Sequence, residues 1–194
     1  TNAAVTPLTV TLSTGQTISI AAGATSGSVS IAAPGEDPHV DASTVSRTIS
    51  STSGGGFEAL TVNPAAATTT VTDTIDTTTL SISGSASVAE GASGSYAVSL
   101  TSPAQTDVTV NLAYSGTAAN GADFSGVATV TIAAGSSSAT FDIATIDDLI
   151  DEVAAESFTV SVTSATGGNF ENLIVSGSNN SVTTSITDND NAPA

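Results

Sequence analysis

The sequence predicts an all-β protein built from two tandem antiparallel β-sandwich domains, the first of which lacks its N-terminal strands. Three observations lead to this prediction. Apolar residues alternate with Ser and Thr in short runs, clusters of Gly, Asn, Pro and Ser separate the runs, and much of the chain repeats itself. Alternation with a period of two places the apolar side chains on one face of a strand. About seven such strands in roughly 110 residues are typical of a sandwich.

The alternating runs are rich in Val, Ile and Thr, which suit a pleated, half-buried surface. Aromatic residues are few, so aliphatic side chains should make up most of the core, with Tyr96 and Tyr114 packing on strands. No segment has a sustained helical period. The expected strands are 8–12, 17–20 and 28–31 in the first half, and 96–100, 108–112, 127–132 and 158–162 in the second.

An internal repeat divides the chain into two related units. The matching segments occur in the same order in both units. The offset in residue number between them is 112 to 115 over most of the chain but 100 at the start, because the second unit carries an insertion around 114–125. The matching segments are 1–10 with 101–110, 21–32 with 133–144, 53–64 with 166–177, and 71–73 with 186–188.

The repeat sets the expected domains. Residues 1–76 form a truncated sandwich, residues 77–190 a complete one, and residues 191–194 begin the next linker. The first unit begins where the second is already some 20 residues along. The start, Thr1 to Ala4, lacks Met, a basic segment and an apolar segment, so it is not a signal peptide. The sequence indicates a piece of a longer array.

The charge excludes several functions. The chain has 18 Asp and Glu against one Arg (Arg47), no Lys and one His (His39), a formal net charge of −17. Binding to nucleic acid needs cationic side chains that release counterions, and an anionic membrane would repel this chain. Disorder is not expected, because 39% of the residues are hydrophobic. Divalent cations are the natural counter-charge for so many carboxylates. Because the chain has no Cys to form disulfides, a bound metal is the expected stabilising cross-link.

The acids of the second unit fall mostly between strands or at strand ends. Alternate loops of a sandwich gather at one end, and calcium takes six to eight oxygen ligands there. A solvated acidic surface is the alternative interpretation. The positions are Glu90, Asp123, Asp147, Asp148, Asp151, Glu152, Glu156, Asp188 and Asp190.

A set of short motifs in this unit resembles the Calx-beta domain. In chain order they are residues 88–91 (VAEG), 116–124 (GTAANGADF), 134–135 (AG), 146–148 (IDD), 156–160 (ESFTV) and 186–190 (ITDND). The resemblance implies an Ig-like, seven-stranded sandwich that binds Ca²⁺ at one end. It implies ligand roles for Glu90, Asp123, Asp147, Asp148, Glu152, Glu156, Asp188 and Asp190. The segment 149–156 is about one residue longer than the usual spacing, which leaves Asp151 as an alternative to Glu152.

The sequence and composition of the repeats resemble those of the extender repeats of large RTX-class bacterial adhesins, the large adhesion protein family. Residues 70–79 (TVTDTIDTTT) and the Ser, Thr, Ala and Gly bias carry this resemblance. It implies a type I-secreted, monomeric stalk at the bacterial cell surface, whose partners are adjacent repeats and whose role is adhesion and biofilm formation. In the first unit the candidate calcium ligands are Glu36, Asp37 and Asp41, with Asp73 and Asp76 at the junction.

The sequence leaves three alternatives to a stalk. An enzyme could take the carboxylate pair for glycoside hydrolysis from among Asp147, Asp148 and Glu156, but the chain has no Trp to stack on sugars, and its one His lies in a Pro- and Gly-containing loop. A calcium-dependent carbohydrate- or receptor-binding module is the main alternative, although repetition favours a stalk. An intracellular calcium sensor is a third, disfavoured by the missing Lys.

The junction gives a first prediction. If an ion at Asp73 and Asp76 stiffens the Thr-rich joint, Asp76→Ala should increase bending between the domains in calcium. Small-angle X-ray scattering of the parent and the variant measures this. Identical scattering curves in calcium would count against a junction ion.

Overall fold

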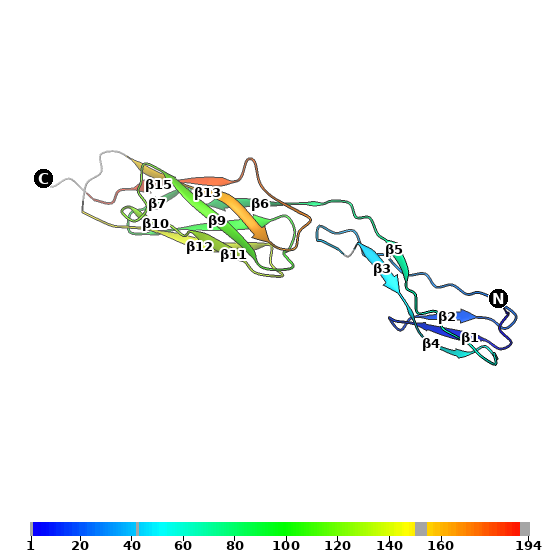
Figure 1. Cartoon of the computed structure of the whole chain (residues 1–194). Helices are drawn as coiled ribbons and strands as arrows, with labels where there is room; N and C mark the ends of the chain where they lie inside the picture. The colour runs from blue at the N-terminus through cyan, green and yellow to red at the C-terminus, as the bar shows by residue number, and fades with distance from the viewer. Residues whose placement is uncertain (1, 42, 150–154, 191–194) are drawn as a thin grey trace. The chain divides into compact units, whose positions relative to one another are not determined.

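The structure, a computed structural model, describes residues 2–41, 43–149 and 155–190. Within these residues every regular element is a strand, which confirms the all-β prediction. The chain forms two compact units (Figure 1). Unit 1 comprises Thr1–Glu36 and Asp41–Thr74, and unit 2 comprises Asp37–Val40 and Ile75–Ala194. In the described part of the chain, no helix is long and apolar enough to cross a membrane.

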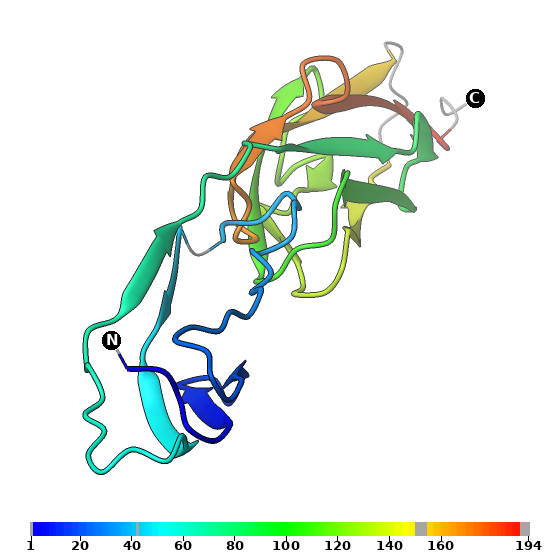
Figure 2. The ribbon, with the colours of Figure 1, turned by 90° about the vertical axis from the view of Figure 1, so that its right-hand side faces the viewer.

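Unit 2 is a sandwich of two five-stranded sheets, whose layers can be followed in Figure 1 and Figure 2. The first sheet has the order β10 (Phe124–Ser125), β12 (Ser138–Thr145), β8 (Ser93–Leu100), β6 (Thr77–Gly84) and β14 (Asn172–Val175). The second has the order β11 (Thr129–Ile132), β9 (Val108–Gly116), β13 (Glu156–Gly167), β15 (Ser181–Thr187) and β7 (Ser87–Ala89).

The core of unit 2 lies between these sheets. Strand β8 shows the expected alternation, since every second residue is buried and the residues between them are exposed or half-buried. Aliphatic side chains make up most of the core, as expected, but aromatic rings occupy its centre: Tyr96, Phe124 and Phe158 are among its largest fully buried side chains. Phe124 stacks on Phe158 with ring centroids 4.3 Å apart. The partly buried Tyr114 also packs against this pair, so both tyrosines pack on strands as predicted.

Two strand pairs in unit 2 are parallel, although most pairs are antiparallel as expected. Strand β14 runs parallel to β6, and β7 runs parallel to β15. The short strand β7 lies between β6 and β8 in the chain but joins the opposite sheet. Because parallel strands point the same way, β7 and β15 end at the same edge, where the acidic residues lie.

Unit 1 reproduces half of this architecture. Its elements are a three-stranded sheet, β2-β1-β4, and a two-stranded sheet, β3-β5. The bounds are β1 (Leu8–Leu12), β2 (Thr17–Ile20), β3 (Thr44–Arg47), β4 (Ile49–Gly54) and β5 (Ala67–Thr70). The pairing of Leu8 with Ile20 matches that of Val108 with Ile132 in unit 2. Residues 28–31, expected to form a strand, form none, so that prediction was wrong.

A hydrogen-bonded pair ties the two sheets of unit 2 together. The Tyr96 hydroxyl donates to Thr184 Oγ1 (2.6 Å), which donates in turn to the Ser85 carbonyl (2.7 Å). Tyr96 on β8 and Thr184 on β15 are both buried. This series of two hydrogen bonds therefore gives both buried hydroxyl groups a partner inside the apolar core.

Removing the Tyr96 hydroxyl or the Thr184 hydroxyl should lower the stability of unit 2 by unequal amounts. Tyr96→Phe deletes one donor and leaves the bond from Thr184 to Ser85, so it should cost about 1 kcal/mol. Thr184→Val leaves the buried Tyr96 hydroxyl without an acceptor and should cost more, about 1–3 kcal/mol. Urea unfolding of both variants measures the difference. A larger loss for Tyr96→Phe would contradict the assigned direction of the hydrogen bonds.

Candidate metal centre

Strand ends bring most of the acids of unit 2 to one end of the sandwich. Strands β7, β12 and β15 end there, and β10 and β13 begin there. Strand pairing places these strand ends beside one another, since Phe124 pairs with Thr145 and Glu156 pairs with Ile186. The sandwich therefore positions carboxylates that are up to about a hundred residues apart in the sequence.

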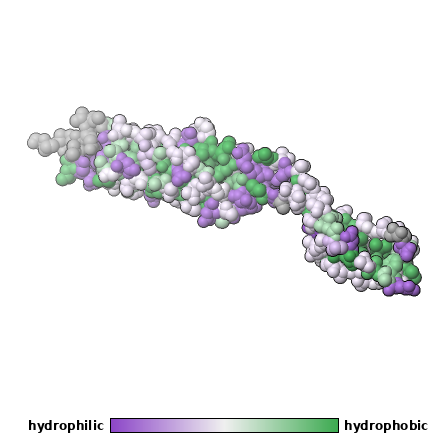
Figure 3. Space-filling model, viewed as in Figure 1, coloured by the Kyte–Doolittle hydropathy of each residue, from purple (hydrophilic) through white to green (hydrophobic). Residues whose placement is uncertain are grey.

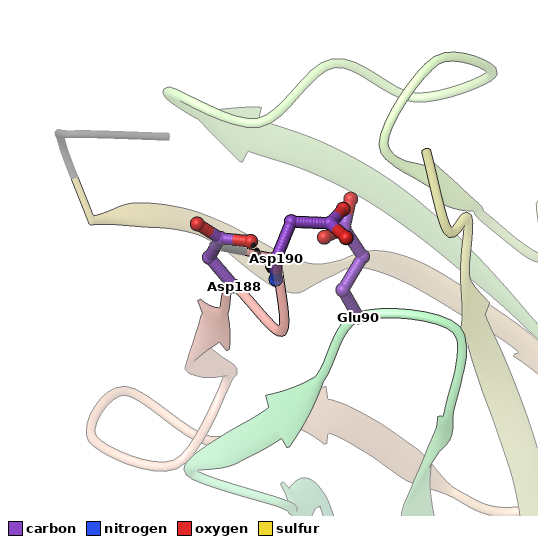
Figure 4. A group of neighbouring side chains, drawn as sticks. All are labelled: Glu90, Asp188 and Asp190. Atoms are coloured by element: carbon purple, nitrogen blue, oxygen red, sulfur yellow. Dashed lines mark hydrogen bonds between the residues drawn. The ribbon is translucent and has the colours of Figure 1, made fainter. Parts of the chain in front are cut away.

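Three carboxylates form a compact group, shown in Figure 4. Glu90 follows β7, while Asp188 and Asp190 follow β15. The parallel ladder is continued by the Glu90 amide, which donates to the Thr187 carbonyl (3.0 Å). One oxygen from each of the three side chains lies within 4.8 Å of the other two. The Asp190 amide donates to Asp188 Oδ1 (2.8 Å), and the Asp190 side chain points towards the Glu90 carboxylate (Figure 4).

Asn189 connects this group to the loop after β12. Its side-chain amide donates to Asp147 Oδ1 (2.8 Å) and to the Glu90 carbonyl (3.2 Å). Asp147 also lies against Gly91, where an added Cβ would come within 3.1 Å of the Asp147 side chain. Gly91 has a φ of 72°, so the turn after Glu90 itself favours glycine. The resulting close approach brings the two loops together.

The electrostatics of Glu90 show how crowded the site is. Its side chain is 8% exposed, and Oε2 is buried without a hydrogen-bond partner. Burial raises the pKa of Glu90 above its usual value, and the negative charges of Asp148, Asp188 and Asp147 raise this pKa further. A carboxylate in this position is stabilised if a cation comes to it.

Glu156 and Asp123 form a second group of carboxyl groups. Burial raises the pKa of Glu156, and the charge of Asp123 and a hydrogen bond between the two carboxyl groups add to this rise in pKa. The charge of Asp148 contributes to both groups. Asp123 Oδ2 also accepts from the Ala119 amide (2.6 Å), which holds the loop that precedes β10.

These residues fit calcium by geometry and chemistry. Calcium binds oxygen at 2.3–2.6 Å, so two ligands on opposite sides of an ion are at most about 4.6–5.2 Å apart, which accommodates the Glu90, Asp188 and Asp190 oxygens. All the donors are oxygens, as a hard cation requires. The chain contains no Lys and one Arg, and Arg47 belongs to unit 1. The buried Glu90 Oε2 is therefore suited to a metal ion.

Of the eight predicted ligands of unit 2, five form these two groups, and two more, Asp147 and Asp148, act on them from the loop after β12. The eighth, Glu152, and its alternative Asp151 lie outside the described residues. The ligand roles themselves stay predictions.

The predicted ligands of the first unit and of the junction lie in different parts of the structure. Glu36, Asp41 and Asp73 line one hollow of about 210 Å³ in unit 1. Asp37 belongs to unit 2, where its Oδ1 accepts from the His39 amide (2.8 Å) and lies 3.1 Å from the His39 ring nitrogen Nδ1. Asp73 lies in unit 1 and Asp76 in unit 2, where the Asp76 amide donates to Glu171 Oε2 (2.7 Å).

Comparison with protein families adds the family to this geometry. The model of the LapA domain matches residues 1–74 and 76–189. The chain belongs to the LapA domain family. The two matched segments are separated by residue 75, which is also where the second segment of unit 2 begins.

Comparison with curated proteins found no match. Among solved structures, 16 chains match. One is the crystal structure of the apo form of the CBD1 domain of Calx, with a TM-score of 0.49 and 23% sequence identity, over 58% of this chain and 98% of that chain.

Sequence reasoning missed the residues that build the site without being acidic. Asn189 links two loops through its amide, and Gly91 allows the Asp147 side chain to approach. Both lie inside the sequence motifs described above, Gly91 beside Glu90 and Asn189 between Asp188 and Asp190. Their position between acids was the available signal.

The raised pKa values predict a pH dependence of the metal-free protein. A carboxyl group whose folded pKa lies above its unfolded pKa binds protons more tightly when folded, so its contribution to stability falls as the pH rises through the folded pKa. Glu90→Gln cannot ionise. In chelator, this variant should therefore be more stable than the parent at pH 7, with the advantage shrinking towards pH 4. Urea unfolding across this range measures the difference, and an advantage that grew on acidification would contradict the raised pKa.

Proposed function

We propose that this chain is a calcium-binding structural extender of an RTX-class adhesin, secreted by the type I route and displayed on the bacterial cell surface. There it would hold a distal binding domain away from the cell for adhesion and biofilm formation. Membership of the LapA domain family supports an adhesin-related protein. The acidic end of unit 2 is the observation that carries the calcium part of the proposal.

Calcium would act by reversing a local repulsion. The loops after β7, β12 and β15 carry Glu90, Asp147, Asp148, Asp188 and Asp190, and the loop before β10 carries Asp123. Without a cation, like charges push these loops apart. A bound ion attracts all of them at once and so joins both sheets at this end. The main effect is on rigidity and stability.

The magnitude is modest for one site and larger for an array. Extracellular calcium modules have Kd values on the order of 10⁻⁴–10⁻³ M. A ligand at a hundredfold excess over Kd adds about 2.7 kcal/mol to the free energy of unfolding. Ordinary saturation gives less, about 1 kcal/mol per site, and repeats add their contributions along a stalk.

A structural role also agrees with what the chain lacks in composition. It has no Cys, so calcium takes the place that disulfides hold in other extracellular modules. It has no Trp for sugar stacking, and its one His is held by contacts to Asp37 and to the Pro103 carbonyl (2.9 Å). We therefore propose a non-catalytic monomer whose partners are neighbouring repeats.

Thermal unfolding in calcium and in chelator tests the calcium part. The parent should melt at a higher temperature in millimolar calcium, with a gain of about 1–3 kcal/mol. Glu90→Gln should lose most of this gain, because an amide supplies one neutral oxygen in place of a carboxylate. The matched control is Asp142→Asn, which removes the same charge from an exposed position on β12 and should keep the gain.

Two outcomes would count against this proposal. An unchanged melting temperature of the parent in calcium would remove the metal-binding role. Equal losses in Glu90→Gln and Asp142→Asn would reduce it to general screening of a charged surface. Magnesium at the same concentration separates a specific site from screening, since Mg²⁺ demands a tighter octahedral shell.

A further inference from the structure

Unit 2 holds one short extended segment by its backbone. This segment, residues 37–40 (DPHV), belongs to unit 2 although the residues on both sides of it belong to unit 1. It forms an antiparallel bridge between His39 and Phe170. A backbone hydrogen bond flanks the bridge on each side, from the Val40 amide to the Asn169 carbonyl (3.0 Å) and from the Glu171 amide to the Pro38 carbonyl (3.1 Å). One edge of unit 2 therefore binds a peptide as a strand would be bound.

The ring of His39 adds the side-chain contacts. It stacks on the Phe170 ring, with centroids 5.1 Å apart and planes at 23°. Its Nε2 donates to the Pro103 carbonyl (2.9 Å), because a carbonyl can only accept. Asp37 Oδ1 accepts from the His39 amide (2.8 Å). Unit 2 thus recognises an acidic residue, a proline and a ring with an N–H donor, in succession.

Unit 1 contains the same site. The internal repeat aligns Gly56, Phe57 and Glu58 with residues 169–171, and Ala3 with Pro103. The loops agree in hydrogen bonding, since the Val5 amide donates to the Gly55 carbonyl (2.9 Å) as the Gln105 amide donates to the Gly168 carbonyl (3.0 Å). Three successive residues have positive φ in each loop, namely Gly54, Gly55 and Gly56 in unit 1 and Gly167, Gly168 and Asn169 in unit 2.

The phenylalanine rings are seated in the same way. Phe57 lies over Gly55 as Phe170 lies over Gly168, and a Cβ added at either glycine would collide with the ring. Glycine is therefore required twice over, for the positive φ and for the approach of the ring. The sequence builds the same aromatic platform in both units.

The platform is covered in unit 2 and open in unit 1. Phe170 is 9% exposed, whereas Phe57 is only half-buried. A hollow of about 420 Å³ lies at Phe57, and the neighbouring Val5, which also lines it, is 72% exposed. Figure 3 shows apolar side chains at the surface of unit 1. Among the described residues, the Gly56 carbonyl and the Glu58 amide have no hydrogen-bond partner. These two groups are the counterparts of the pair that binds residues 37–40 in unit 2.

We propose that the hollow at Phe57 is a docking site for an extended peptide of the Asp-Pro-His-Val kind, presented by another polypeptide. The site of unit 2 gives the register. The peptide ring stacks on Phe57 and donates to the Ala3 carbonyl, while the peptide backbone pairs with the Gly56 carbonyl and the Glu58 amide. The proline favours an extended conformation in the residue before it, which lowers the cost of ordering the peptide. This proposal goes beyond the extender role and does not depend on calcium.

A titration followed by NMR tests this proposal on the full chain. The probe is the tetrapeptide Asp-Pro-His-Val with acetylated and amidated ends. The amide signals of residues 56–58 should shift with a dissociation constant in the millimolar range, because so short a peptide buries little area and must be ordered. The signals of residues 169–171 should stay, since the joined segment keeps its own site filled at a high effective concentration. The His39→Ala form of the peptide should bind about tenfold more weakly, because it lacks the stacking and the ring hydrogen bond.

A protein variant gives a second measurement. Phe57→Leu keeps an apolar side chain but removes the ring, so it should weaken binding of the parent peptide about fivefold to tenfold. The matched control is Val29→Ala, which lies at a different hollow of unit 1 and should leave binding unchanged. Unshifted amide signals of β1 show that unit 1 stays folded in both variants.

The remaining outcomes overturn the proposal. Signals of residues 56–58 that do not shift at about 10 mM peptide show that the platform binds no such segment. Shifts confined to residues 169–171 mean that the peptide only displaces the joined segment. Equal binding of the reversed peptide Val-His-Pro-Asp, or of the His39→Ala peptide, shows contact with an apolar hollow without recognition. The peptide comparison decides the matter even where Phe57→Leu unfolds unit 1.

Discussion

Everything in this chain depends on one requirement, that the apolar face of one β-sheet be covered by another. In unit 2 the two five-stranded sheets meet it, and Tyr96, Phe124 and Phe158 fill the space between them. The cover also aligns the ends of strands from both sheets, and so it assembles the acidic end. In unit 1 only one layer is present as strands, and hollows lie over it.

At the acidic end the carboxylates repel one another and would attract a cation, so stability there depends on whether a cation is bound. Glu90 and Glu156 are held where burial and neighbouring charges disfavour ionisation, and Asp148 contributes to both. A protein that kept these charges without a cation would lose stability at neutral pH. Hydrogen bonds from Asn189 and from the Asp190 amide arrange the side chains while leaving Glu90 Oε2 to face the group. Preparation of this kind lowers the cost of ordering the loops when an ion binds.

The fold class and six of the seven expected strands were predicted correctly from the sequence, because a period of two and an internal repeat are strong local signals. The described residues form further strands that were not predicted. The sequence also predicted that acids distant in the sequence would meet. Three features escaped it. Residues 28–31 have the pattern of a strand but no neighbour to pair with, and strand pairing is decided by tertiary context. The parallel course of β7 beside β15 depends on a three-residue strand that no periodicity reveals, and Asn189 acts through a side-chain amide with no charge to mark it.

Residues 37–40 carry a practical consequence for how the chain can be divided. They belong to unit 2, where the His39 ring stacks on Phe170 at 5.1 Å and the Val40 amide donates to the Asn169 carbonyl (3.0 Å). A fragment that began at Ile75 would look like a whole domain by sequence, yet it would strip the cover from an aromatic ring and leave backbone groups unpaired. Proteolysis within 37–40 would damage the second unit even though the cut lies in the sequence of the first repeat. The boundaries of a repeat and the boundaries of a folding unit are different objects in this protein.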